Sequence, residues 1–420
     1  MREMKDSGIE WIGQIPKDWD VVPHKRVMHK VKKICEQYSG EDIISLTMNG
    51  VIKRDLTAGG KMPTSFDGYQ YVKPNDLLLC LFDIDVTPRC VGVVKDYGVT
   101  SPAYSRFVMH DGYYNAYYDY LLRAIDDDKV FVHLSKNLRS SLTESDFGAI
   151  KTCVPSLAEQ KRIVTFLDAQ CAEIDAVLEK TRASIEEYKK LKQAVITQAV
   201  TKGIRGDRPM KDSGIEWIGD IPAEWTASKI KYCTEFAPLC NTSHLSEDSV
   251  VTFTPMECIK NGYFENREAH FSALSSSYTQ YQDGDIVFAK VTPCFENGNI
   301  AIMQGLSAGV GFGSSELFVI RPQSINTEFI FYYLQNDIFK QYACATMTGT
   351  GGLKRVSPTF VRNYSVFIPC NEEQLEIVRY LNEKCSGIEV LIAKKQQYLT
   401  EIENYKKSLI YEYVTGKREV

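Results

Sequence analysis

Residues 155–180 read PSLAEQKRIVTFLDAQCAEIDAVLEK, and residues 369–394 read PCNEEQLEIVRYLNEKCSGIEVLIAK. The two stretches align without a gap at a spacing of 214 residues, and the likeness continues to Thr201 and Thr415. The Glu-Gln pair near the start and most of the apolar positions recur as the same residue or the same class. A repeat of this length indicates that one module, roughly 205 residues long, occurs twice. Any function must therefore use two copies.

Apolar residues in both copies recur with a period near 3.5 over about five heptads, which is typical of a helix that buries a narrow seam against another helix. The pattern predicts one long helix over 155–201 and a second over 369–415. Capping boxes are predicted at Ser156 with Glu159 and at Asn371 with Gln374, and C-caps at Gly203 and Gly416. The predicted seams are Leu167, Ile174 and Val195 with Ile163/Val164, Cys171, Val177/Leu178 and Ile185 in the first copy, and Leu381, Ile388, Ile402 and Leu409 with Ile377/Val378, Cys385, Leu391/Ile392, Leu399 and Tyr405 in the second.

Matched length and matched seams favour pairing of the two helices with each other rather than with a second chain. If a two-fold axis relates the copies, the helices run antiparallel and would act as a ruler between two globular parts. A homodimeric coiled coil is the alternative.

A shorter repeat precedes each variable part. Met4–Pro16 (MKDSGIEWIGQIP) returns as Met210–Pro222 (MKDSGIEWIGDIP). Between the repeats, short β-prone runs alternate with Gly, Pro, Asn and Asp, which predicts an irregular mixed sheet with long loops. Tyr113–Ala124 is predicted to be a helix whose tyrosines enter the core, and Asn326–Asn336 to be its counterpart. The repeated helices and the short repeated segment therefore form a common frame, and the two variable parts differ in sequence.

The composition is 44% hydrophobic without a run of 18 apolar residues, and the N-terminus is charged, so we expect a cytoplasmic protein that does not cross a membrane. The twelve cysteines form no C-x-x-C pair, which favours buried thiols over disulfides or zinc ligands. The net charge of −5 means that any DNA binding relies on local basic patches.

The sequence contains no recognisable catalytic motif. An Asn/Asp-Pro-Pro-aromatic loop of an amino-methyltransferase is lacking, and so is a G-x-x-x-x-G-K-[ST] phosphate loop. The triplet Glu187–Lys189 lies on the predicted coiled coil, where it is a solvated charge pair. Turn chemistry explains Asp83/Asp85 and Asp283/Asp285 better than a metal site. We therefore expect no catalytic residue and no metal in this chain.

Over essentially all 420 residues, the chain resembles the specificity subunit of a type I restriction–modification system. The motifs that carry the resemblance are Gly8–Trp19, repeated at Gly214–Trp225, and Pro155–Gln160, repeated at Pro369–Gln374. The resemblance implies an α+β fold with two target-recognition domains separated by two long antiparallel coiled-coil helices in a pseudo-two-fold duplication. The implied segments are an N-terminal conserved segment at 1–19, the first recognition domain at 20–154, a central helix at 155–203, a linker with the repeated segment at 204–225, the second recognition domain at 226–368, and a C-terminal helix at 369–420.

The resemblance also implies a function: a DNA-binding subunit that reads a bipartite target, one half-site per domain, with the spacer set by the helices. The implied partners are double-stranded DNA, two methyltransferase subunits and ATP-driven restriction subunits. S-adenosylmethionine, ATP and Mg²⁺ are expected on those partners and no cofactor on this chain. One alternative is a coiled-coil scaffold with two protein-binding lobes that never touches DNA. Another is a bilobed hydrolase whose catalytic groups are too far apart in sequence to recognise.

Candidate DNA contacts are basic residues in the variable parts, with arginine weighted most because its fork fits guanine edges and phosphates. The basic run Lys25–Lys33 is either a phosphate-contacting patch or a solvated face. The candidate DNA contacts are Lys25, Arg26, Lys30, Arg54, Arg89, Arg139, Lys290, Lys354 and Arg355. The candidate contacts to protein partners are Trp11, Trp217, Tyr411 and Tyr413.

Overall fold

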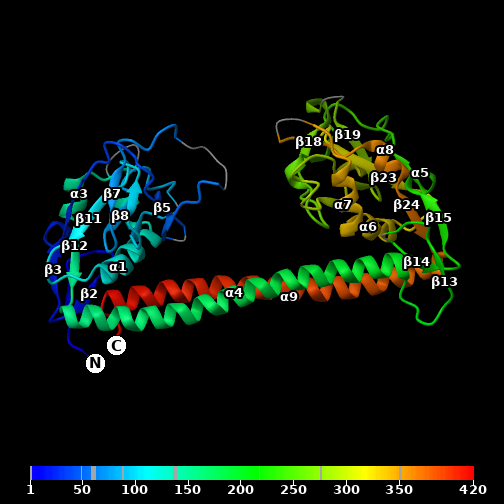
Figure 1. Ribbon diagram of the computed structural model, residues 1–420. Coiled ribbons are helices and arrows are strands. Elements are labelled where there is room, and N and C mark those ends of the chain that lie inside the picture. The colour runs from blue at the N-terminus through cyan, green and yellow to red at the C-terminus, as the bar shows by residue number, and fades with distance from the viewer. Residues whose placement is uncertain are drawn as a thin grey trace. The chain divides into compact units, whose positions relative to one another are not determined.

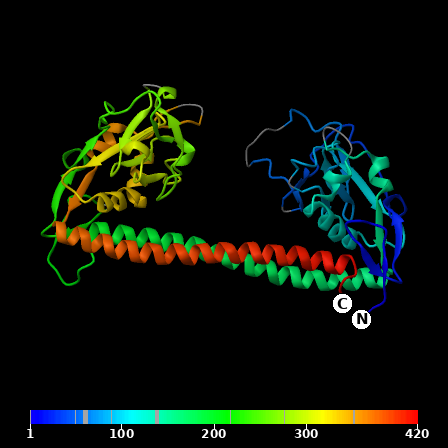
Figure 2. The ribbon, with the colours of Figure 1, turned by 180° about the vertical axis from the view of Figure 1, so that it is seen from behind.

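The computed structural model describes residues 2–48, 50–57, 63–87, 89–135, 140–216, 218–274, 277–349 and 352–420. The chain forms two compact units, and the first of them joins two distant stretches of sequence. Unit 1 comprises Met1–Arg182 and Gln397–Val420, and unit 2 comprises Ala183–Gln396. Both ends of the chain therefore belong to unit 1, where the N and C marks lie together in both views (Figure 1, Figure 2).

Two long helices, α4 (Leu157–Lys202) and α9 (Asn371–Val414), confirm the predicted pair, and each runs from one unit into the other. In unit 1, Lys406 binds Asp175 at 2.6 Å, whereas Arg182, later on α4, binds the earlier α9 residue Glu403. In unit 2, Lys192 binds Glu389. Residue numbers fall along α9 as they rise along α4, so the helices are antiparallel in each unit, as expected.

The seam between α4 and α9 holds most of the predicted residues. Leu167, Cys171 and Leu178 of α4 are buried, as are Leu381 and Cys385 of α9. Val177, Leu391 and Tyr405 were also predicted to lie in the seam, but they are 40%, 43% and 53% exposed, so those assignments are wrong. An α-helix drifts by about 20° per heptad against a strict seven-residue repeat, and a position can thereby rotate out of the seam.

Among its described residues, unit 1 contains a four-stranded antiparallel sheet in the order β4-β11-β8-β9 and four strand pairs, β1-β2, β3-β12, β5-β6 and β7-β10. Its elements before α4 are β1 (Met4–Asp6), β2 (Gln14–Pro16), β3 (Asp20–Pro23), η1 (His24–Arg26), β4 (Met28–Lys30), β5 (Ile44–Thr47), β6 (Gly50–Lys53), β7 (Gln70–Val72), β8 (Leu77–Leu79), β9 (Val91–Val93), β10 (Gly98–Thr100), β11 (Ser105–Met109), α1 (Asn115–Asp127), α2 (Val130–Leu134), α3 (Glu144–Ala149) and β12 (Lys151–Val154).

Unit 2 repeats this plan, with sheet β16-β23-β20-β21, a second sheet β18-β17-β22-β19 and the pairs β13-β14 and β15-β24. Its elements are β13 (Met210–Asp212), β14 (Asp220–Pro222), β15 (Thr226–Lys229), α5 (Ile230–Cys233), β16 (Thr234–Phe236), β17 (Val250–Thr254), η2 (Met256–Cys258), β18 (Glu268–His270), η3 (Phe271–Ala273), β19 (Thr279–Gln282), β20 (Ile286–Ala289), β21 (Ile300–Ile302), η4 (Ser307–Gly309), β22 (Val310–Gly313), β23 (Leu317–Pro322), α6 (Thr327–Gln335), α7 (Asp337–Ala345), α8 (Pro358–Asn363) and β24 (Ser365–Ile368).

Unit 2 contains a mixed sheet, because β17 pairs parallel with β22. In unit 1, an isolated parallel bridge joins Ile43, just before β5, to Val99 of β10. Among the described residues, every other pairing between named strands is antiparallel. The predicted mixed sheet is therefore present in unit 2, whereas unit 1 has its parallel contact at a single bridge.

The core of unit 1 forms where α1 meets the sheet β4-β11-β8-β9 and α4, and that of unit 2 where α6 meets the sheet β16-β23-β20-β21 and α9. Tyr117 and Tyr118 of α1 are fully buried, which confirms that the tyrosine helix faces the core. The Tyr117 hydroxyl donates to the Val414 carbonyl at 2.8 Å and so ties α1 to the end of α9. All twelve cysteines are free. Within the described parts of the chain, no helix is long and apolar enough to span a membrane.

Candidate nucleic-acid interface

One carboxylate anchors the base of each lobe to a long helix. In unit 1, the buried Trp19 donates its indole N–H to Glu159 at 3.0 Å, and Arg2 binds the same carboxylate. In unit 2, Trp225 donates to Glu373 at 3.1 Å, and Arg208 binds Glu373 at 2.5 Å. The spacing between Arg2 and Arg208 equals the spacing between Trp19 and Trp225, so the arginine recurs together with the tryptophan. The whole Trp–Glu–Arg triad is therefore duplicated.

The glutamine after each of these glutamates holds a second segment. Gln160 accepts from the Tyr114 backbone N–H at 2.8 Å and donates to the Pro155 carbonyl at 2.9 Å. Gln374 repeats both bonds with Asn326 and Pro369 at the same distances. The recurring Glu-Gln pair thus fixes the tryptophan segment and the start of α1 or α6 on the first turn of α4 or α9.

The predicted capping box at Ser156 is only half formed. The Ser156 hydroxyl accepts from the Glu159 backbone N–H at 3.3 Å, as predicted. The Glu159 side chain, however, binds Trp19 and Arg2 instead of the N-cap backbone. A buried indole N–H without a partner costs more than an unsatisfied exposed N-cap, so the tryptophan takes the carboxylate.

On this frame, unit 1 presents the basic residues of η1 and β4. Lys25 and Arg26 are exposed, and Lys30 lies 3.4 Å from Glu144 at the start of α3. Together with His29, Lys25 and Lys30 line a hollow of about 350 Å³ between η1, β4 and α3. The structure therefore brings two of the predicted cations, Lys25 and Lys30, to one hollow, while Arg26 is exposed next to Lys25 in η1.

His24, within the same basic run, adds no charge to that hollow. It is completely buried and packs on the Phe147 ring at 4.7 Å. Neither ring nitrogen has a partner among the described residues. Burial lowers the pKa of His24 to about 4, so the ring is neutral at physiological pH.

Arg54 and Arg89 lie near the β5-β6 hairpin of unit 1. Arg54 follows β6 and is half-buried. Arg89 donates from Nε to the Val91 carbonyl at 2.9 Å and from Nη1 to the Met48 carbonyl at 3.3 Å, and burial lowers its pKa. Arg89 thus ties the hairpin to β9. Whether either arginine also contacts DNA remains a prediction.

In unit 2, the structure brings three predicted residues together across more than sixty positions of sequence. The Thr292 N–H donates to the Lys354 carbonyl at 3.0 Å, and the Lys354 N–H donates to the Thr292 hydroxyl at 3.0 Å. The Val356 N–H donates to the Lys290 carbonyl at 2.8 Å. The Arg355 guanidinium forms a fork with Glu316, with both N–O distances at 2.9 Å, and Lys290 lies 4.0 Å from the same carboxylate. Lys290 and Arg355 line an open hollow of about 760 Å³.

Three of the four predicted partner contacts, Trp11, Tyr411 and Tyr413, lie in unit 1. Trp11 is half-buried, and its carbonyl accepts from the Tyr411 hydroxyl at 2.8 Å. Tyr413 is buried and packs against Phe166 at 4.4 Å. Both tyrosines thus stabilise unit 1 itself, and a role in binding another subunit stays a prediction. Trp217 and the DNA candidate Arg139 lie outside the described residues.

Sequence reasoning missed Glu316, the triad arginines and two buried ion pairs. Arg106 binds Asp76 at 2.6 Å in unit 1, and Arg321 binds Asp285 at 2.7 Å in unit 2. Each aspartate immediately precedes the strand β8 or β20, within the repeated Asp-Leu/Ile-aliphatic pattern. That repetition was a usable signal for the aspartates, whereas Glu316 has no repeated counterpart that would have revealed it.

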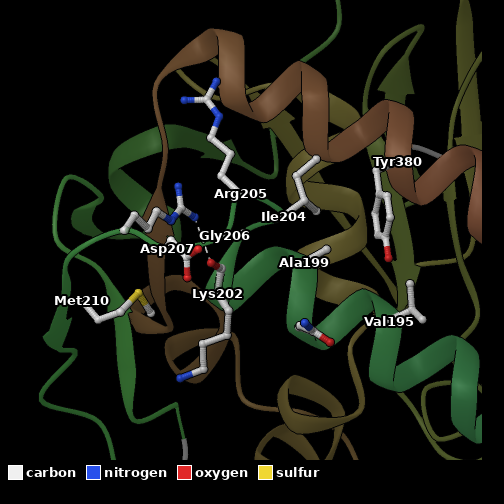
Figure 3. Close-up of a pocket in the computed structure, with 12 residues that line it drawn as sticks. Val195, Ala199, Lys202, Ile204, Arg205, Gly206, Asp207, Met210 and Tyr380 are labelled. Carbon is white, nitrogen blue, oxygen red and sulfur yellow. Dashed lines mark hydrogen bonds between the residues drawn. The ribbon is translucent and has the colours of Figure 1, made fainter.

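A further hollow, of about 490 Å³, lies in unit 2 where α4 ends, and Tyr380 faces Ala199 and Val195 across it (Figure 3). Its cations are engaged by the chain itself. Arg205 forms a fork with Glu376 at 2.9 and 2.8 Å, and Lys202 donates to the Ile218 carbonyl at 2.8 Å. This hollow therefore marks a structural junction between the modules rather than a site with charges ready for an anion.

Among the described residues, no cluster of three or more His, Cys, Asp or Glu side chains is placed to hold a metal ion. Burial raises the pKa of Asp119, but this carboxylate pairs with Arg123 on the next turn of α1 at 2.6 Å. Asp119 is thus accounted for as a structural ion pair.

Comparison with known proteins adds an independent line of argument. Residues 228–401 match the family described as "Type I restriction modification DNA specificity domain". The chain is 32% identical to the "Type I restriction enzyme EcoEI specificity subunit" of Escherichia coli over 43% of this chain and 32% of that protein. The chain thus matches about a third of the length of the first curated relatives.

Two further matches extend along nearly the whole chain. The "Putative type I restriction enzyme MjaX specificity subunit" of Methanocaldococcus jannaschii is 22% identical over 97% of this chain and 96% of that protein. A solved chain described under "Structural basis underlying complex assembly and conformational transition of the type I R-M system" superposes with a TM-score of 0.71 at 13% identity, covering 96% of this chain and 99% of that chain. This second likeness concerns the fold.

Proposed function

Because the chain belongs to the family of type I restriction–modification specificity subunits, we propose that it is the sequence-specific DNA-binding subunit of such a system. Each recognition lobe reads one half of a bipartite target, and the bases between the halves are not read. The observation that carries the proposal is the duplicated Trp–Glu–Arg triad, which seats two divergent lobes on equivalent frames.

Basic residues on the lobes support the assignment of DNA as ligand. In unit 1, Lys25 and Lys30 line a hollow between η1, β4 and α3, and Arg26 is exposed in η1. In unit 2, Lys290 and Arg355 lie beside Glu316, and Lys354 precedes Arg355 in the same loop. Local cations of this kind supply phosphate and base contacts although the net charge of the chain is −5. Arg139, Arg54 and Arg89 are proposed as further contacts of the first lobe.

We propose that the chain is not itself an enzyme but positions enzymes on DNA. Two methyltransferase subunits that carry S-adenosylmethionine, and restriction subunits that use ATP and Mg²⁺, are the proposed partners, and the cytoplasm is the proposed location. The contacts proposed for them are Trp11, Trp217, Tyr411 and Tyr413, with the exposed face of α9. A protein-binding scaffold that ignores DNA is disfavoured by the family to which the chain belongs.

Methylome sequencing tests this function directly. The chain is expressed in a host together with its partner methyltransferase, and a second host expresses the methyltransferase alone. We expect a methylated motif with two specified halves and an unspecified spacer in the first host only. If the two proteins copurify but no chain-dependent motif appears, the scaffold alternative replaces the proposal. Failure to copurify would contradict the proposed partnership.

A further inference from the structure

Arg355 is oriented by a carboxylate that occupies one particular edge of its guanidinium. Nε and Nη2 donate to the two oxygens of Glu316, each at 2.9 Å. This fork uses the side of the guanidinium and leaves the end edge, with Nη1 and the second Nη2 hydrogen, directed away from Glu316. Nη1 makes no hydrogen bond to any residue that the structure describes, and the side chain is 48% exposed.

Both partners of this fork are held in place by their backbones. The Arg355 N–H donates to the Thr348 carbonyl at 2.8 Å, and Thr348 returns the bond at 3.0 Å. The Glu316 N–H donates to the Ser314 hydroxyl at 3.2 Å, and the Glu316 carbonyl accepts from the Lys290 N–H at 3.0 Å. The guanidinium is therefore preorganised from two sides before any ligand arrives.

The charge at this position favours one kind of acceptor over another. Glu316 is ionised, because Arg355 and Lys290 lower the pKa of its carboxyl group. A phosphate approaching Arg355 would meet that negative charge, whereas the neutral O6 and N7 acceptors of guanine would not. The end edge of an arginine fork matches O6 and N7 in the major groove. The geometry therefore suits reading a base better than neutralising the backbone.

Building on the proposed function, we infer that Arg355 reads a guanine in the half-site bound by unit 2, and that Glu316 is the positioning residue that sets its edge. The hollow of about 760 Å³ beside Arg355 provides the open space for this contact. Among the residues of unit 1 that the structure describes, aligning α3 with α8 places Ser141 where Arg355 stands, so the aligned position carries no guanidinium. The inference therefore concerns the half-site bound by unit 2.

Binding measurements on the complex with the methyltransferase test this inference. The first duplex carries the wild-type motif. In the second duplex, A·T replaces the G·C pair of one half-site, namely the half-site whose binding changes in the Arg355 variants. We expect the wild-type complex to prefer the first duplex by roughly 5- to 150-fold. With Arg355→Ala this preference should fall to about one- to twofold, because no donor to O6 and N7 remains. With Arg355→Lys, used where binding of the alanine variant is too weak to titrate, the preference should fall less, because a lysine still donates to O6 and N7 but is not oriented by the fork with Glu316.

The variant Glu316→Gln tests whether the Glu316 carboxylate orients the Arg355 guanidinium or only stabilises the loop. Removing the carboxylate charge should reduce the preference for guanine, raise affinity for an unrelated duplex and steepen the salt dependence by about one phosphate contact. Arg205→Ala is the matched control, because Arg205 makes the same fork with Glu376 outside the lobe. The control should leave the preference unchanged.

The outcomes distinguish the inference from the function on which it rests. If the wild-type chain directs no methylation, the proposed function fails. If methylation is directed but the affected half-site contains no G·C pair, or if the preference survives in both Arg355 variants, the inference is overturned while the function stands. An equal loss of preference in Arg205→Ala would also overturn it.

Discussion

At Glu373, three segments of unit 2 meet within hydrogen-bond distance: the indole of Trp225, the guanidinium of Arg208 and the first turn of α9. The Glu373 side chain is 1% exposed and that of Arg208 is 9% exposed. Removing one member of a buried ion pair leaves the other charge without compensation. This carboxylate is therefore a point where a single substitution loosens a whole lobe.

We predict that Glu373→Ala lowers the free energy of unfolding of unit 2 by roughly 3 kcal/mol. Glu376→Ala, three residues later on α9, is the control, because its partner Arg205 forms a surface pair and the change should be small. Urea unfolding of both variants provides the measurement. Equal destabilisation would show that the triad contributes no more than an exposed ion pair.

His24 makes unit 1 sensitive to acid. Its pKa is about 4 in the folded chain, below the ordinary 6.5, so above pH 6.5 the ring is neutral in both states and pH has no effect through this group. As the pH falls below 6.5, the unfolded chain takes up a proton that the folded chain does not, and stability is lost down to about pH 4. At pH 5 this loss amounts to about 2 kcal/mol.

His24→Leu should remove that part of the acid sensitivity. The measurement is urea unfolding at pH 7.5 and pH 5.0, and the wild type should lose about 2 kcal/mol more than the variant between the two. Comparing the pH dependence, rather than absolute stability, cancels any change in packing against Phe147. The same pH dependence in both proteins would show that His24 is protonated freely in the folded chain.

At the scale of elements, α9 carries an exposed apolar stripe. Leu391, Tyr398 and Tyr405 follow one another at seven-residue spacing and are all about half exposed. Residues at that spacing lie on one side of a helix, and aromatic side chains are frequent hot spots of protein interfaces. The position of Tyr405 outside the seam thus fits a role in binding a partner helix.

We predict that Leu391→Ser with Tyr405→Ser weakens binding of the methyltransferase by at least about tenfold while the helix content stays unchanged. Leu375→Ser is the control, since Leu375 is also about half exposed on α9 but lies at a different heptad position. Pull-down titration and circular dichroism give the two readouts. Wild-type affinity in the double variant would place the methyltransferase elsewhere on the chain.

Helices and strands could be predicted where the residues that determine them lie close together in the sequence. Both long helices could be predicted to within two residues at each end, because each seam repeats along continuous sequence. The strands β8 and β11 likewise follow from short apolar runs. The fork between Glu316 and Arg355 could not, because it joins the turn before β23 to a loop 39 residues away, and no period relates the two positions.

At the scale of the whole molecule, duplication determines which parts of the chain are free to change. Residues that hold the frame, such as Glu159 and Gln160, recur with the same partners in the second copy. Residues at the proposed reading surface, such as Arg355, do not recur. Because the residues that hold each lobe are distinct from those on its proposed reading surface, the specificity for one half-site can change without altering how either lobe is held.

The final prediction concerns the spacing of the half-sites. We expect that one additional heptad after Lys180 and another after Lys394 lengthen the unread spacer by about 10 Å, or about three base pairs. Seven residues keep both seams in register, and the two insertions are needed together because α4 and α9 pack against each other in both units. Methylome sequencing of a host expressing the double insertion measures the spacer.

Two further variants show whether the helices themselves set this distance. A heptad in α4 alone leaves the partner helix too short and should abolish methylation. Insertions of four residues in both helices rotate the seams out of register and should do the same. If the double heptad variant methylates the original motif with an unchanged spacer, the bound subunits determine the separation of the half-sites, and α4 and α9 serve only to join the two lobes.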